Sequence, residues 1–202
     1  RRIPLVPFGA GSGVCAGVQP DPRAIVLDVK RMRKIERVDA DGLVAQAQAG
    51  ILGQHLEDGL EAKGLTLGHF PSSIYCSSLG GWVVTRSAGQ LSSRYGKIED
   101  MVLAVEGIDG RGLPIRASVD DPATGPGLVQ LLTGSEGALF VCTRVTLRVR
   151  PLPSRATTCA RLRRISSVST HVGLIITQVT PWGAPSSATQ RVKPSRPDFE
   201  AQ

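Results

Sequence analysis

Alternating apolar and polar positions run through the first three quarters of the chain and predict β-strands. The clearest case is residues 138–150, where Val145, Leu147 and Val149 alternate with polar residues. Successive side chains of a strand point to opposite faces, so this pattern indicates a half-buried strand. Further strands are predicted over residues 3–6, 24–29, 35–39, 43–49 and 101–108.

A change of period predicts a helix over residues 51–63. Three leucines recur there at four-residue spacing, on one helical face, and Gly64 stands where a glycine ends a helix. His55 is expected to be a surface or packing residue. Two more helices are predicted, one within residues 77–89, where a serine and two glycines precede an apolar run, and a short one over residues 128–132.

These elements predict an α+β fold. The Asp-Gly pairs at residues 41–42 and 109–110 are hairpin-turn signals. Strands that pair through such turns form a mixed or antiparallel sheet, and we expect the helices to flank it. The chain of 202 residues is long enough for one domain with a sizeable core.

Composition changes abruptly after Pro153. Residues 154–202 are biased toward Ser, Thr, Pro and Arg without a sustained period, so we expect a domain over residues 1–153 and a disordered basic tail, or a translated frameshift. Of the net charge of +7, residues 151–202 carry +5. Aromatic residues do not interleave with this charge, which disfavours the rival interpretation of a nucleic-acid-binding protein.

Cysteine and histidine placement argues against a metal site. Cys15, Cys76, Cys142 and Cys159 are far apart and form no C-x-x-C pair, so we expect small buried hydrophobes. The three histidines are also scattered. No apolar run approaches the ~20 residues of a membrane helix, and we expect a cytoplasmic protein. Because the sequence starts at Arg1, we expect further sequence upstream.

Residues 7–13, PFGAGSG, form a glycine-rich loop after the first predicted strand. Such a loop offers backbone N–H groups to a phosphate or pyrophosphate. The glycines, with Asp28 downstream, also fit a Rossmann loop. That loop must open a helix, whereas Pro20, Pro22 and the strand at residues 24–29 follow here. The order strand, loop, strand disfavours a Rossmann loop and leaves an ordinary glycine-rich turn as the other alternative.

Three segments together carry a resemblance to a known family. They are PFGAGSG, then PSSIYCSSLGGWVVTRSAGQLSSRYGKIEDMV at residues 71–102, and GSEGALFVCTRVTLRVRPLP at residues 134–153. In this order they resemble the FAD-binding domain of the FAD-linked oxidases, of PCMH or vanillyl-alcohol oxidase type. The likeness is greatest to alkyldihydroxyacetonephosphate synthases and bacterial FAD-binding oxidoreductases. The second segment, S-x-GGW-x-x-TR-x-x-G followed by YG-x-IED-x-V, is the most specific.

The resemblance implies a PCMH-type fold in which FAD lies extended between two subdomains. The glycine loop would hold the pyrophosphate and ribose, and residues 70–76 would border the flavin. The helix start after Ser77 would contact the pyrophosphate, and residues 136–142 would close over the adenine half. The implied cofactor-binding residues are Phe8, Gly9, Ala10, Gly11, Ser12, Gly13, Val14, Pro71, Ser72, Ser73, Ser78, Leu79, Gly80, Gly81, Thr85, Arg86, Glu136, Gly137, Ala138, Leu139, Val141 and Cys142.

Some of these residues have a plainer interpretation. Trp82 is expected in the core, and Arg86 has the alternative of pairing with Glu99 or Asp100. Phe140 stands where members of the family often carry a glycine. The family's first βαβ unit before the strand at Ile3 and its C-terminal cap domain are missing, so we expect an incomplete N-terminal subdomain.

The resemblance implies a FAD-dependent oxidoreductase acting on a small molecule: a hydroxy acid, an alcohol or an acyl-dihydroxyacetone phosphate. The reaction is then hydride transfer to the flavin or alkylglycerone-phosphate synthase-like chemistry, the latter peroxisomal in eukaryotes. The cap supplies the catalytic residues in the synthase, so none is placed here, and His69 is only a weak candidate for a base. The alternative is a catalytically inactive flavin-binding fragment.

Overall fold

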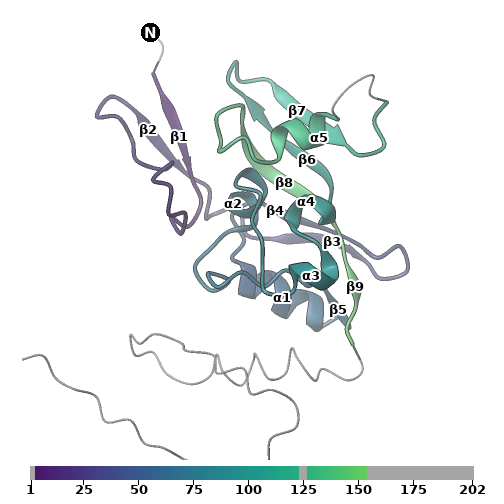
Figure 1. The fold of residues 1–202 in the computed structure, drawn as a ribbon. Coiled ribbons are helices and arrows are strands. Elements are labelled where there is room, and N and C mark those ends of the chain that lie inside the picture. The colour runs from purple at the N-terminus through teal and green to yellow at the C-terminus, as the bar shows by residue number, and fades with distance from the viewer. Residues whose placement is uncertain (1–2, 123–126, 154–202) are drawn as a thin grey trace, which may run out of the picture. The chain divides into compact units, whose positions relative to one another are not determined.

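The computed structural model describes residues 3–122 and 127–153 (Figure 1). The expected tail at residues 154–202 lies outside them and stays a prediction. The strands are β1 Leu5–Phe8, β2 Ile25–Asp28, β3 Ile35–Asp39, β4 Val44–Gln48, β5 Leu65–Thr66, β6 Val102–Asp109, β7 Pro114–Ser118, β8 Phe140–Arg148 and β9 Arg150–Pro151. The helices are α1 Gly53–Glu61, α2 Leu79–Val84, α3 Ser92–Tyr95, α4 Ile98–Met101 and α5 Leu128–Leu132.

The main sheet is antiparallel throughout and has the strand order β3-β4-β8-β6-β7. β1 and β2 form a separate parallel pair (Figure 1), and β5 pairs with β9. This arrangement confirms the predicted α+β fold, with a mainly antiparallel sheet and a few short helices. No helix within the described residues is long and apolar enough to cross a membrane.

The core lies between the sheet and the first two helices. β4 and β8 contribute alternating buried side chains, among them Ala45 and Leu147. α1 contributes Leu56 and Leu60, two of the leucines whose spacing predicted it, and Trp82 of α2 is buried as expected. The periodic positions therefore became the core.

The boundaries of most predicted elements agree within about two residues, and β3 and α5 match them residue for residue, whereas β1 lies two residues later than expected. Gly64 has a φ of +72° just after α1, as a helix-ending glycine should. Three short elements, β5, α3 and α4, were not predicted. The strand β7 was not predicted either, because PIRAS is short and begins with proline. Its pairing with β6 across the second Asp-Gly turn makes it a strand.

The structure also decides two questions about the N-terminal region. The chain passes from β1 through the glycine loop directly to the parallel strand β2, so the loop is not a Rossmann loop. The expectation of buried cysteines is correct for Cys142 and wrong for Cys15 and Cys76, which are exposed. These two lie in turns rather than in core elements. Cys159 lies outside the described residues.

Glu57 of α1 is a buried carboxylate that organises the segment before the site. Its Oε1 accepts hydrogen bonds from Thr66 Oγ1 at 2.9 Å and Gly68 N at 3.1 Å, and Oε2 accepts one from Leu67 N at 3.2 Å. Burial nevertheless raises the pKa of this carboxyl to about 7, because the charged form is desolvated. The hydrogen bonds lower the pKa and only partly offset burial.

We expect Glu57 to make stability fall as the pH rises from 4.5 to 7. In this window the folded state, with a pKa of about 7, binds more protons than the unfolded chain, whose carboxyl has a pKa near 4.5. The group therefore removes up to about 3 kcal/mol of stability across the window. Urea denaturation at both ends of the window measures this. Glu57→Gln, which does not titrate, should flatten the profile, and an unchanged slope would contradict the assignment.

Candidate functional site

The loop between β1 and β2 is rich in unpaired backbone donors. None of the N–H groups of residues 9–17 has a hydrogen-bond acceptor within the described part of the chain. Gly11 has a φ of +73°, a left-handed conformation that glycine adopts without strain. Successive unpaired N–H groups in a loop of this kind form an anion-binding nest.

The start of α2 is capped from within the protein. Ser78 Oγ accepts the N–H of Gly81 at 3.3 Å. The N–H of Leu79 donates to Ile51 O, and that of Gly80 donates to Ala49 O at 2.7 Å. The first N–H groups of this helix are therefore already paired. The unpaired donors beside them are the loop N–H groups and the hydroxyl of Ser78.

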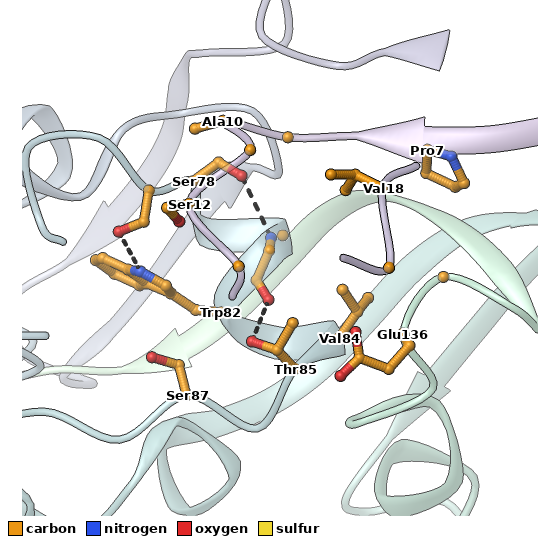
Figure 2. Close-up of a pocket in the computed structure, with 18 of the residues that line it drawn as sticks. Pro7, Ala10, Ser12, Val18, Ser78, Trp82, Val84, Thr85, Ser87 and Glu136 are labelled. Atoms are coloured by element: carbon orange, nitrogen blue, oxygen red, sulfur yellow. Dashed lines mark hydrogen bonds between the residues drawn. The ribbon is translucent and has the colours of Figure 1, made fainter. Parts of the chain in front are cut away.

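A pocket of about 330 Å³ lies between this loop and α2 (Figure 2). The two walls touch at Gly9 and Ser78, where a Cβ on Gly9 would overlap the Ser78 hydroxyl oxygen. On a third side, Glu136 approaches Gly17. A Cβ added to Gly17 would lie 3.5 Å from Oε2 of Glu136. The volume is at the lower end of the roughly 300–1,000 Å³ typical of ligand pockets.

The structure brings most of the predicted cofactor residues together around this pocket. Those that line it are Gly9, Ala10, Gly11, Ser12, Gly13, Val14, Ser73, Ser78, Gly80, Gly81, Thr85, Glu136, Gly137 and Cys142. Those outside its lining are Phe8, Pro71, Ser72, Leu79, Arg86, Ala138, Leu139 and Val141. Contact of each residue with the cofactor stays a prediction.

Individual contacts explain why some residues lie outside the lining. Leu79 is fully buried in the core. The Phe8 ring faces the backbone of Gly11 and lies 5.3 Å from the Lys30 ammonium. Leu139 is exposed to solvent.

Arg86 follows its alternative interpretation as an ion-pair partner. Its Nη1 lies 2.7 Å from Glu99 Oε2, and its Nη2 donates to the carbonyl of Gln130 at 2.7 Å. The pKa of Glu99 is lowered, chiefly by the hydrogen bond from Lys97 and also by the one from Arg86. Burial acts in the opposite direction and is outweighed. With φ at +51°, Arg86 also has a strained backbone. The guanidinium therefore ties α2 to α4 and α5.

Ten further residues line the pocket that were not among the implied cofactor-binding residues. They are Pro7, Cys15, Gly17, Val18, Val29, Ser77, Trp82, Val84, Ser87 and Phe140. Ser77 and Ser87 flank the predicted residues in sequence, which was an available signal. Val29 reaches the pocket only because β2 pairs in parallel with β1. Phe140 is accommodated because Gly107 leaves room for its ring.

The residues present fit the diphosphate of a dinucleotide. The unpaired N–H groups of residues 9–17 can hold its negative charge without a lysine. Gly9 allows the loop to approach Ser78, and the rest of the lining is largely apolar, as a bound ring system requires. Within the described residues, no group of three His, Cys, Asp or Glu side chains could hold a metal ion.

Known proteins resemble this chain in sequence and in fold. The sequence pattern of the FAD binding domain family matches residues 1–118. Alkyldihydroxyacetonephosphate synthase of Caenorhabditis elegans is 38% identical over 154 residues, which are 74% of this chain and 26% of that protein. Glycolate oxidase subunit GlcD of Bacillus subtilis is 32% identical over 179 residues, 87% of this chain and 38% of that subunit.

A solved structure of an alkyldihydroxyacetonephosphate synthase superimposes with a TM-score of 0.69 at 30% identity, covering 81% of this chain and 32% of that one. The chain thus spans about a quarter to two fifths of the length of these relatives. Family pattern, relatives and fold agree: this chain belongs to the FAD binding domain family.

Proposed function

We propose that this chain is the cofactor-holding part of a flavin-dependent enzyme and that, by itself, it binds FAD without turning over substrate. The proposed substrate is a small molecule. It is a 2-hydroxy acid or an alcohol that is oxidised, or an acyl-dihydroxyacetone phosphate in alkylglycerone-phosphate synthase-like chemistry. Relatives named alkyldihydroxyacetonephosphate synthase and glycolate oxidase subunit support these two classes. When bound, FAD supplies the group that accepts a hydride or engages the substrate.

The observation that carries the proposal is that the pocket lining suits the binding of a cofactor better than catalysis on a substrate. Apart from the Glu136 carboxylate beside Gly17, the described lining offers mainly hydrogen-bond donors, glycines and apolar surface, which bind and orient a cofactor. A substrate also needs a positioned group that exchanges a proton near neutral pH. Burial raises the pKa of Cys142 to about 12. Next to the pocket, burial lowers the pKa of His69 to about 4, which makes it a weak base.

We expect the isolated chain to bind FAD and to show no enzymatic turnover. Quenching of flavin fluorescence measures binding, with NADH as the comparison ligand. Turnover is assayed with D-lactate, with glycolate, and with an acyl-dihydroxyacetone phosphate plus a fatty alcohol. Only slow reaction of the flavin with reductants and oxygen is expected, because rate acceleration needs a positioned substrate.

Two outcomes would contradict this proposal. Robust turnover that is lost in His69→Ala would show that the chain carries its own base. Binding of NADH without binding of FAD would contradict the assignment of the pocket. A further experiment adds the remaining part of a related enzyme as a separate protein. Restored turnover would show that this chain is a working cofactor domain rather than an inactive fragment.

A further inference from the structure

The hydroxyl groups on the α2 wall of the pocket differ in whether their protons are already used. Ser77 Oγ accepts from Trp82 Nε1 and donates to Ser73 O, both at 2.7 Å. Thr85 Oγ1 donates to Gly81 O at 2.8 Å. These two hydroxyls have no proton left for a ligand.

Ser87 lies on the same wall, and Figure 2 shows it near Trp82 and Thr85. Its backbone is held on both sides, since its N–H donates to Trp82 O and its carbonyl accepts from Ile98 N. The partner that the structure gives to its hydroxyl is His69, whose Nε2 lies 3.1 Å from Ser87 Oγ.

His69 is a buried imidazole, only 1% exposed. Trp82 packs against it edge-to-face with ring centroids 4.8 Å apart. Burial lowers its pKa to about 4, so the ring is neutral at physiological pH and carries one N–H. Its Nδ1 is buried and has no hydrogen-bond partner within the described residues.

The unpartnered Nδ1 decides which nitrogen carries the proton. A proton on Nδ1 would bury an N–H without an acceptor, which costs more than burying a lone pair. We assign the proton to Nε2 from this hydrogen-bond network. Nε2–H then donates to Ser87 Oγ, and the Ser87 hydroxyl keeps its own proton.

We propose that Ser87 donates a hydrogen bond to the bound cofactor, and that His69 is the positioning residue that directs the Ser87 hydroxyl proton into the pocket. FAD offers two acceptors of suitable chemistry, the diphosphate oxygens and the polar atoms of the flavin ring. The inference rests on FAD binding and is independent of the reaction proposed above.

The binding test uses the full chain and flavin fluorescence quenching. Ser87→Ala should weaken FAD binding about five- to tenfold, the effect of one hydrogen bond. His69→Leu should weaken it at least as much, and the double variant no further than His69→Leu alone. His69→Gln, whose amide can donate in place of Nε2–H, should restore most of the affinity, which a purely structural role would not predict. Ser93→Ala, an exposed serine of α3, is the control.

A second arm identifies the acceptor. If the Ser87 hydroxyl contacts the diphosphate, Ser87→Ala also weakens the binding of ADP. If it contacts the flavin ring, ADP binding is unchanged and the absorption spectrum of bound FAD shifts. Unchanged affinity for both ligands in Ser87→Ala overturns the proposal.

A third arm needs no cofactor. Nitrogen-15 NMR of labelled histidine at neutral pH reports which ring nitrogen of His69 carries the proton. A proton on Nε2 is expected. A proton on Nδ1 would make Ser87 the donor to His69 and would overturn the proposal whatever the FAD affinity.

Discussion

Gly11→Val is expected to weaken FAD binding by more than tenfold, that is by more than ~1.4 kcal/mol, with only a modest loss of folding stability. Gly11 has a φ of +73°, which a β-branched residue adopts only under strain. A Cβ there would also lie 2.9 Å from Cζ of Phe8. Because the loop is exposed, it can relieve the strain by changing conformation. That change removes the nest of unpaired N–H groups.

The measurement is the FAD dissociation constant from fluorescence quenching, beside the urea midpoint. Gly110→Val is the matched control, because a Cβ on Gly110 meets no atom within 4 Å and its φ is outside the left-handed region. His55→Ala, a change on the exposed surface of α1, should also leave binding unchanged. If Gly11→Val binds FAD as tightly as Gly110→Val, the loop is not the pyrophosphate site.

Gly80→Val is expected to act first on folding, lowering the free energy of unfolding by about 3 kcal/mol or more. Gly80 lies against the end of β4, where a Cβ would be 2.8 Å from Ala49 Cβ and 3.0 Å from Ala49 O. Its N–H also donates to that carbonyl at 2.7 Å. A valine therefore separates α2 from the sheet, and FAD binding is lost with the fold.

Thermal unfolding of the apoprotein checks this second prediction, with an expected fall in Tm of about 6–12 °C. Gly81→Ala is the matched control on the same helix, because its Cβ would meet only the Ser78 hydroxyl, at 3.1 Å. If Gly80→Val keeps the wild-type Tm and still loses FAD, the glycine serves the ligand directly. Gly11→Val and Gly80→Val thus distinguish a glycine that shapes the binding loop from one that allows α2 to pack against the sheet.

Periodicity and local punctuation determined most of the secondary structure. Alternation located the strands because a half-buried strand must alternate, and β3 and α5 were found to the residue. The leucine spacing located α1, and Gly64 ended it. The glycine loop and the Ser78 cap were also visible, because an anion nest and a helix start have local residue requirements. These features placed most of the predicted cofactor residues around one pocket, where contact with FAD stays a prediction.

Tertiary structure alone decided what the individual residues do there. Gly11 and Gly80 both line the pocket, yet Gly11 lies in the exposed loop, whereas Gly80 also packs on Ala49. Arg86 pairs with Glu99, and His69 meets Ser87 across 18 residues. Such roles depend on which distant segments the fold brings together. A local pattern shows which groups a segment offers, whereas packing determines which of them remain free for a ligand.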